Sequence, residues 1–488
     1  MTGCGDAGTS SDTQTGSAPT SVSDTDPTVA STVPTGSAGT TEGVGTMGMT
    51  GSMSTTDAPT GPGPTSDPTA DPTTMGTTAG TLTATSTGAV SVSTTDTAGD
   101  TSDSTGGPKL DVGSPGCPPD NQATTFDFIW IANTTQATVS KINTMTGIEV
   151  GRYYTHPSMS GQAEPSRTSV NQYGDVAVSN RSLGSVTKVM ALESKCIDKN
   201  GNGTIETSTG PNDIKPWGQD ECVVWHTAFP LANGYSGGVR PTAWEGVAQD
   251  PNTCITPVPR LWIGYKEANN TAHFVRLHGD TGEVLDEALR PNWAANSFGP
   301  YGGAVNSAGD LFATGYDNEI GVRVDAATMQ IEEIGNSPGT YKYGMGVDKH
   351  GNMWVGSFSG PHHLYFYDAA AKQWQGMGDG GTGFGGALGV AVDDEDRVWG
   401  AANGPCRLIE LDGATKTWSN QNIVLPGCGS PWGVSIDNEG YVWVVDKANQ
   451  AFKVDPDTYE FKLIVTGLIN PYTYSDMTGQ GLQLVLPQ

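Results

Sequence analysis

The stretch Pro431-Trp432-Gly433-Val434-Ser435-Ile436-Asp437-Asn438-Glu439-Gly440-Tyr441-Val442-Trp443 decides the fold of this chain. It contains a glycine, an acidic residue four positions later and a large apolar residue six positions beyond that. The same pattern, with an amide in place of the acid in one copy, recurs at intervals of 42, 45 and 44 residues. The copies are Gly302/Asn306/Phe312, Gly344/Asp348/Trp354, Gly389/Asp393/Trp399 and Gly433/Asp437/Trp443. A period of this length is typical of propeller blades, so we predict an all-β β-propeller.

Three further units fit the pattern less closely. The second unit lacks the glycine and the aromatic residue, and the third needs six extra residues, 251–256. The first unit starts at its second strand, 128–133, and has no first strand before it. The last residues of the chain repeat the four-then-six spacing and could supply that strand. We therefore expect seven blades, closed by a C-terminal strand that leaves no open edge. The alternative is a six-bladed ring in which the second unit is an insertion. The triplets of the second, third and closing units are Arg167/Asn171/Ala177, Gly246/Asp250/Trp262 and Tyr472/Asp476/Leu482.

Residues 1–108 differ in composition from the rest of the 488-residue chain. They contain no aromatic residue, Lys, Arg or His, and consist largely of Ser, Thr, Gly, Pro, Ala and Asp. Such a segment buries too little apolar surface to offset its conformational entropy, so we predict a disordered tether before a folded domain at 109–488. The formal net charge of −28 argues against nucleic acid as a partner. No apolar run approaches the roughly 18 residues of a membrane-spanning helix.

The cysteines suggest export. Met1-Thr2-Gly3-Cys4 resembles the end of a bacterial lipoprotein signal, in which the cysteine is lipidated. That resemblance implies a lipid-anchored protein of the cell envelope, at the outer membrane or surface, while the alternative is an ordinary thiol at Cys4. Six cysteines in the domain predict three disulfides, and free thiols are the alternative. Proximity in sequence favours two pairs and leaves the third: Cys196–Cys222, Cys406–Cys428 and Cys117–Cys254.

The pattern 431–443, followed by Val454-Asp455-Pro456-Asp457-Thr458, resembles the streptogramin (virginiamycin B) lyase-like propellers over about residues 120–488. In that family a histidine before the strand glycine and acids after the tryptophan strand support metal-assisted elimination at one mouth of the ring. The matching positions here hold no histidine. The resemblance therefore implies an enzyme only if Glu245 and Asp446 pair around a divalent metal such as magnesium.

The same positions carry aromatic residues instead. We expect a ligand site formed by Arg167, Tyr301, Tyr343, Trp432 and Tyr472, with Tyr265, Glu245 and Asp446 nearby. Flat aromatic faces with a few directed polar groups suit a carbohydrate, a peptide or a small apolar molecule. The alternative is that these side chains only plug the centre of the ring.

Residues 198–206, Asp-Lys-Asn-Gly-Asn-Gly-Thr-Ile-Glu, match the first nine positions of an EF-hand-type calcium loop. The twelfth position is Thr209 rather than glutamate, and Asp213, Asp220 or Glu221 could supply that carboxylate. We predict a structural calcium site within an insert at about 196–222, and an ordinary Asn-Gly turn is the alternative. The predicted ligands are Asp198, Asn200, Asn202, Thr204 and Glu206.

Three functions remain open from the sequence. The first is a monomeric, lipid-anchored binding protein that takes a ligand or a protein partner at its aromatic mouth and has no catalytic activity. The second is a lyase-like or lactonase-like enzyme that uses Glu245, Asp446 and a metal. The third is a purely structural envelope protein with a filled centre.

Overall fold

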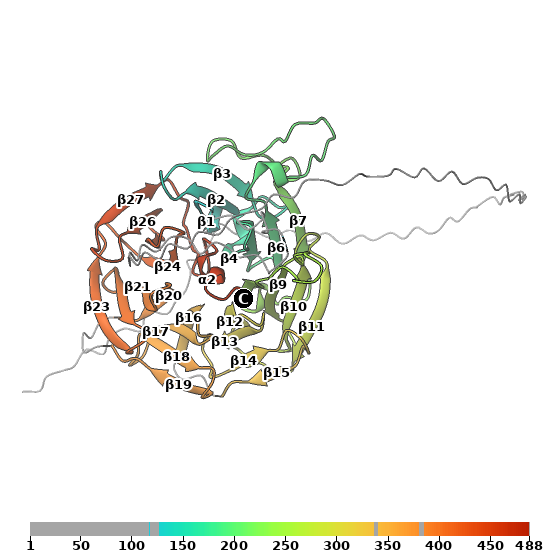
Figure 1. Ribbon diagram of the computed structural model, residues 1–488. Coiled ribbons are helices and arrows are strands. Elements are labelled where there is room, and N and C mark those ends of the chain that lie inside the picture. The colour runs from blue at the N-terminus through green and yellow to red at the C-terminus, as the bar shows by residue number, and fades with distance from the viewer. Residues whose placement is uncertain (1–116, 118–125, 336–339, 380–384, 488) are drawn as a thin grey trace, which may run out of the picture. The chain divides into compact units, whose positions relative to one another are not determined.

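The computed structural model describes residue 117 and residues 126–335, 340–379 and 385–487. In this part of the chain the strands form seven antiparallel sheets arranged as a ring (Figure 1). The predicted seven-bladed β-propeller is confirmed. The second unit forms a blade of its own, so the six-bladed alternative is wrong. The expected tether at 1–108, with Cys4, lies outside the described residues.

Each blade after the first has four strands paired in chain order, and the first strand of each lies innermost. Blade 1 contains β1 (Phe128–Asn133), β2 (Thr138–Asn143) and β3 (Glu149–Tyr154). Blade 2 contains β4 (Pro165–Val170), β5 (Val176–Asn180), β6 (Ser185–Val189) and β7 (Val223–Ala228). Blade 3 contains β8 (Thr242–Trp244), β9 (Arg260–Lys266), β10 (Ala272–His278) and β11 (Val284–Arg290). Blade 4 contains β12 (Pro300–Val305), β13 (Leu311–Gly315), β14 (Gly321–Val324) and β15 (Ile331–Glu333).

The last three blades repeat this arrangement. Blade 5 contains β16 (Thr340–Val347), β17 (Met353–Ser359), β18 (Leu364–Asp368) and β19 (Gln373–Gly376). Blade 6 contains β20 (Ala387–Val392), β21 (Arg397–Ala402), β22 (Arg407–Asp412) and β23 (Thr417–Val424). Blade 7 contains β24 (Pro431–Ile436), β25 (Val442–Asp446), β26 (Gln450–Val454) and β27 (Phe461–Thr466). The described helices are single turns: η1 (Thr134–Gln136), η2 (Gly161–Ala163), η3 (Glu193–Lys195), α1 (Gly234–Gly237) and α2 (Gln480–Gln483).

The repeated aspartate joins the turn between the first two strands of a blade to the core. In blade 7, one carboxylate oxygen of Asp437 accepts the backbone N–H groups of Glu439 and Tyr441. The other oxygen accepts the indole N–H of Trp443 at 2.9 Å. The same indole bond measures 3.1 Å in blade 5 and 3.0 Å in blade 6. The four-then-six spacing therefore reflects one hydrogen-bonded unit per blade.

Asparagine replaces the aspartate in the two blades that lack the tryptophan. Asn171 and Asn306 each accept the two turn N–H groups, as the aspartates do. The residue six positions after each asparagine is alanine or phenylalanine, which has no N–H to donate. A neutral amide is therefore sufficient at these two turns, because its oxygen has to accept only the two turn N–H groups and no indole N–H.

The C-terminal segment completes blade 1, as predicted. Pro471 forms a β-bridge with Asn133, and Met477 accepts the backbone N–H of Trp130 at 2.8 Å. The segment between these contacts is irregular rather than a regular strand. Gly479 adopts φ +86°, which is close to the turn glycine Gly440 at +84°.

The chain departs from the predicted pattern after Gly479. Leu482 was expected on a strand but lies on α2, at the centre of the ring (Figure 1). Its side chain is buried in a cluster that includes Trp244, Val305 and Val347, from three different blades. The last residues of the chain therefore fill one end of the ring's centre.

The register of the third blade corrects the sequence interpretation. Trp262 pairs with Ala243, just as Trp443 pairs with Ser435 in blade 7. Counting back two residues places Pro241, not Gly246, at the glycine position. The insertion after β8 is consequently longer than the six residues that the sequence suggested.

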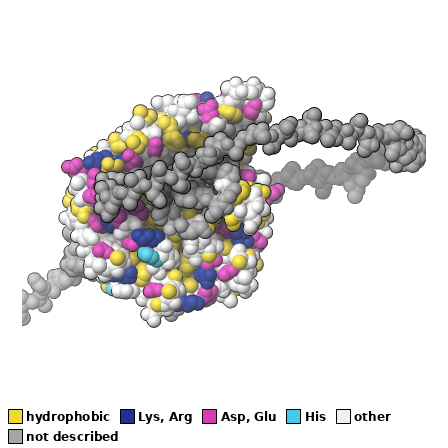
Figure 2. Space-filling model, viewed as in Figure 1, with side chains coloured by type: hydrophobic (Ala, Val, Ile, Leu, Met, Phe, Trp, Pro, Cys, Tyr) yellow, Lys and Arg dark blue, Asp and Glu magenta, His cyan; other side chains and the backbone are white. Residues whose placement is uncertain are grey.

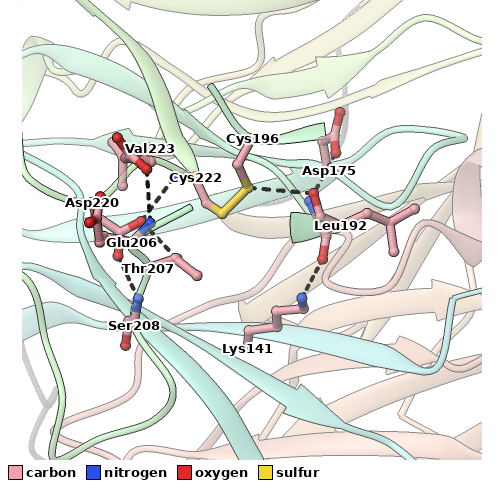
Figure 3. The surroundings of a disulfide bond; sticks show 12 residues. Lys141, Asp175, Leu192, Cys196, Glu206, Thr207, Ser208, Asp220, Cys222 and Val223 are labelled. Atoms are coloured by element: carbon pink, nitrogen blue, oxygen red, sulfur yellow. Dashed lines mark hydrogen bonds between the residues drawn. A yellow bond between two sulfur atoms is a disulfide. The ribbon is translucent and has the colours of Figure 1, made fainter. Parts of the chain in front are cut away.

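All three predicted disulfides are present: Cys117–Cys254, Cys196–Cys222 and Cys406–Cys428. The Cys196–Cys222 bond closes the insert between β6 and β7 (Figure 3). Beside it, Asp220 accepts hydrogen bonds from the side chain of Thr207 and the backbone N–H groups of Ser208 and Cys222. Three disulfides are compatible with an exported protein.

One face of the described domain carries mixed charge. Acidic and basic side chains are interspersed on the face shown in Figure 2, rather than gathered by sign. None of the helices in the described ranges has the length and apolar character needed to cross a membrane.

Candidate functional site

One end of the ring's centre gathers the predicted aromatic residues. We call this end the mouth, and define it by the residues that precede the glycine position of each inner strand. They are Ser166, Arg240, Tyr301, Tyr343, Leu388 and Trp432. Tyr301, Tyr343, Leu388 and Trp432 form one buried cluster with Tyr472, Tyr474 and Tyr316.

The rings of this cluster pack directly on one another. The ring centres of Trp432 and Tyr472 lie 4.6 Å apart, and those of Tyr343 and Trp432 lie 5.3 Å apart. The hydroxyls of Tyr343 and Tyr472 are hydrogen-bonded at 2.9 Å. Burial raises the pKa of Tyr472 well above its ordinary value. Tyr265 lies apart from the cluster, because it stacks on His273 with 4.5 Å between ring centres.

Tyr474 is one of two tyrosines in this cluster, the other being Tyr316, that the sequence interpretation missed. Its ring centre lies 5.0 Å from that of Tyr343 and 5.2 Å from that of Tyr472. The signal was its position two residues after Tyr472, because alternate residues of an extended segment face the same side. The C-terminal segment therefore brings two tyrosines to the mouth.

Arg167 reaches into the aromatic cluster from β4. Its guanidinium carbon lies 3.1 Å from the ring centre of Tyr474, and Nη2 donates to the carbonyl oxygen of Tyr301 at 2.8 Å. Burial lowers the pKa of Arg167 to about 9, and the positive charge of Arg240 adds to this effect. The cationic form of Arg167 is thus held in an unfavourable environment that cation–π contacts offset only in part.

Arg240 is a second buried arginine at the mouth, and it occupies the position that the sequence interpretation assigned to Glu245. Its guanidinium carbon lies 4.9 Å from the ring centre of Phe298, 5.0 Å from that of Tyr301 and 5.0 Å from that of Tyr235. The sequence did not reveal Arg240, because β8 has Pro241 in place of the repeated glycine. Without that glycine, the sequence alignment of this blade was displaced by five residues, from Arg240 to Glu245. Arg181 lies close by, 4.5 Å from the ring centre of Tyr472, and its Nε is 3.4 Å from a carboxylate oxygen of Glu164.

The two carboxylates expected to share a metal do not come together. Asp446 ends β25 and pairs with Pro431, at the mouth. Glu245 follows the last residue of β8, so it lies at the opposite end of the inner strands. The structure therefore does not bring Glu245 and Asp446 together, and magnesium binding stays a prediction. The cause is the register of blade 3.

Both carboxylates make structural contacts. Asp446 accepts the backbone N–H groups of Gly429, Ser430 and Ala448, and the side-chain amide of Gln450. Gly429 and Ser430 lie in the loop before β24, and Ala448 and Gln450 lie after β25, so Asp446 joins the two loops.

Glu245 bonds to two arginines on its own side of the ring. One carboxylate oxygen lies 2.6 Å from Nε of Arg260, and the other lies 3.4 Å from Nη1 of Arg276. Burial raises the pKa of Glu245, and these two cations oppose the rise. The carboxylate is thus held in the blade rather than presented to a ligand.

The predicted calcium loop brings four of its candidate ligands together. Asp198 accepts the backbone N–H groups of Gly201, Asn202 and Gly203, which holds the pKa of its carboxyl below the ordinary range. The side-chain amides of Asn200 and Asn202 each donate to Glu206 at 2.7 Å. Asp198, Asn200, Asn202 and Glu206 are thus linked around one turn.

The three acids considered for the twelfth position take other partners. Glu221 accepts the backbone N–H groups of Lys199 and Glu206. Asp213 pairs with Lys215 at 2.8 Å, and Asp220 bonds to the insert as described above. No group of three or more His, Cys, Asp or Glu side chains in the described ranges has the geometry of a metal site. Calcium binding therefore stays a prediction.

These observations define a class: a seven-bladed β-propeller whose mouth combines packed aromatic rings with buried arginines. No protein-family model matches the chain, and no curated protein matches its sequence. Virginiamycin B lyase from Staphylococcus aureus has a similar fold at 13% identity and a TM-score of 0.45, over 64% of this chain and 88% of that chain. A streptogramin B lyase has a similar fold at 12% identity and a TM-score of 0.46, over 65% of this chain and 89% of that chain. Apo AztD from Citrobacter koseri has a similar fold at 9% identity and a TM-score of 0.44, over 71% of this chain and 97% of that chain. These similarities concern the fold and not the activity.

Proposed function

We propose that this chain is a binding protein that takes its ligand at the aromatic mouth and catalyses no reaction. The observation that carries the proposal is the chemistry of the mouth, where six rings and buried arginines meet and the carboxylate of Asp446 is occupied by four N–H donors. Aromatic rings and directed N–H donors recognise ligands, whereas general acid–base catalysis needs a titrating group aimed at the substrate.

A thermal-shift panel tests this proposal. We expect one class among oligosaccharides, cell-wall peptides and macrocyclic lactones to raise the melting temperature of the protein, because a ligand of the native state stabilises it by mass action. The shift should disappear in Trp432→Ala, measured from the baseline of that variant. Trp418→Ala is the matched control, because Trp418 lies on the outer strand β23 and bonds to Met377. A shift that survives Trp432→Ala would place the ligand elsewhere.

A structural envelope protein is the second candidate function. It is favoured by α2 and the C-terminal segment, which fill the centre of the ring, and by the low exposure of the mouth rings, none of which exceeds 5% in the cluster. A flat panel, with stability that responds to no ligand class, would favour this function over the first.

The insert is proposed to bind Ca²⁺ in a structural role, with Asp198 as the first ligand. In the chain as described, the two asparagine amides bond to Glu206, and a cation would instead take their carbonyl oxygens after rotation of the amides. We expect millimolar Ca²⁺, but not the same concentration of Mg²⁺, to raise the melting temperature, and Asp198→Ala to abolish the effect. Asp280→Ala is the control, because this exposed acid lies outside the insert. An equal response in Asp198→Ala would contradict the assignment.

The lipid anchor at Cys4 is proposed to hold the domain at the bacterial cell envelope. The three disulfides support export, as does the lipoprotein-like start of the chain. We expect the protein expressed with a lipoprotein signal to partition into detergent, and the Cys4→Ser variant to remain in the aqueous phase. Equal partitioning of the two proteins would refute the anchor.

A further inference from the structure

The mouth contains an unusual number of buried donors without acceptors. Among the described residues, no hydrogen-bond partner exists for Nη1 of Arg167, for Nε and Nη2 of Arg240, or for the hydroxyl of Tyr474. The hydroxyl of Ser166, which stands one residue before Arg167, also lacks a partner. These side chains are between 0% and 2% exposed. Buried polar groups are normally hydrogen-bonded, so five such atoms at one end of the ring call for an explanation.

The positive charge at the mouth is also uncompensated. Arg181 has Glu164 as an ion-pair partner, but no carboxylate in the described part of the chain lies within ion-pair distance of Arg167 or Arg240. Both guanidinium groups flank the same ring, because their central carbons lie 5.1 Å and 5.0 Å from the ring centre of Tyr301. Buried cations are normally paired, and this chain has 52 acidic residues from which a partner could have come. The composition of the chain therefore does not explain the missing counter-charge.

We propose that the mouth binds an organic oxyanion, a carboxylate, phosphate or sulfate group carried on a ring-shaped body such as a sugar, and that Arg167 and Arg240 hold the anionic group. This inference rests on the proposed binding function and names its ligand class. The planar fork of a guanidinium matches two oxygens of a carboxylate or phosphate, and the free N–H groups of Arg240 lie on neighbouring atoms of that fork. The tyrosine faces would pack against the body of the ligand.

Two partly exposed aromatic side chains lie against Arg240. Tyr235, on the single-turn helix α1, and Phe298 both lie against Arg240, and both are only partly buried. Their ring centres are 5.8 Å apart. Both residues lie outside the strands of the blades, so a ligand that reached Arg240 past these two rings would require no change in the inner strands.

The test measures anion binding to the full-length protein at constant ionic strength. The probes are sodium glucuronate, glucose 6-phosphate, inorganic phosphate and neutral glucose. We expect glucuronate or glucose 6-phosphate to raise the melting temperature and to give a saturable calorimetric titration, and glucose to do neither. The first two probes distinguish a planar from a tetrahedral anion, and inorganic phosphate shows whether the ring is needed. A response that follows ionic strength alone, with chloride as effective as the probes, would overturn the proposal.

The arginine variants assign the site. Arg240→Met and Arg167→Met should each weaken binding at least tenfold, whereas Arg290→Met should leave it unchanged. Arg290 is the matched control, because it lies on the outer strand β11 and pairs with Glu333 at 2.7 Å. Should a methionine variant fail to fold, Arg240→Lys retains the charge without the fork and is expected to fold and to bind at least threefold more weakly.

A second readout separates a ligand-binding arginine from a structural one. In the absence of any anion, Arg240→Met should melt at the same temperature as the wild type or higher, because an uncompensated charge leaves the interior. A clear fall in melting temperature together with unchanged anion affinity would refute the proposal. A neutral ligand that is lost in Trp432→Ala but binds Arg240→Met normally would leave the binding function intact and overturn this inference alone.

Discussion

Asp437→Ala is expected to lower the free energy of unfolding of the domain by about 3–5 kcal/mol. The substitution removes the acceptor of the Trp443 indole N–H and of two turn N–H groups. It also removes a buried partner of Lys453, whose amine lies 2.9 Å from the Asp437 carboxylate. Lys453 is 4% exposed and would keep only Glu439 and the carbonyl of Thr144 as partners. Several buried groups therefore lose compensation at once.

Urea unfolding followed by tryptophan fluorescence measures this effect. Asp437→Asn should cost less than Asp437→Ala, because asparagine satisfies the equivalent turns at Asn171 and Asn306. Asp457→Ala is the control, since this acid is 75% exposed and makes a surface pair with Arg397, and we expect a loss of at most about 1 kcal/mol. Equal losses for Asp437→Ala and Asp457→Ala would contradict the role assigned to the repeated acid.

Removal of the Cys117–Cys254 disulfide by paired serine substitutions is expected to cost about 5 kcal/mol, by the loop-entropy relation. The bond joins residues that are 137 positions apart, so it restricts the unfolded chain more than either of the other two bonds. The Cys406–Cys428 bond spans only 22 positions, for which the same relation gives about 3.5 kcal/mol. The longer loop should therefore lose more stability when it is opened.

Non-reducing urea denaturation of the two paired variants provides the comparison, and each variant serves as the control for the other. If the loss for Cys406–Cys428 equals or exceeds that for Cys117–Cys254, strain or residual structure in the unfolded state dominates, and the loop-entropy account fails.

The spacing of one hydrogen-bonded unit made the fold predictable. Asp348, Asp393 and Asp437 each lie six residues before a tryptophan whose indole they accept, so the contact is local and leaves a periodic trace in the sequence. The disulfides were predictable for a related reason. Two of the pairs are short-range, and the even number of cysteines in the domain then defines the third.

The residues of the candidate site were predictable only in blades that keep the repeated glycine of the inner strand. Tyr301, Tyr343 and Trp432 precede a glycine, and the structure brings them together with Tyr472 as expected. Glu245 was misplaced because blade 3 has proline at the glycine position and a long insertion after β8. Its true mouth residue, Arg240, follows no pattern that a repeat could reveal.

The sequence by itself determined that the chain forms an all-β propeller ring, since each blade repeats a local set of turn and core contacts, and the structure decided for seven blades over six. Only the tertiary structure decided which side chains meet at the centre, because that depends on the register of each inner strand and on the path of residues 471–477. Hydrogen bonds within one blade span a few residues and appear as a period in the sequence. The approach of Arg167, Arg240 and Tyr474 joins three distant segments, and no local spacing records it.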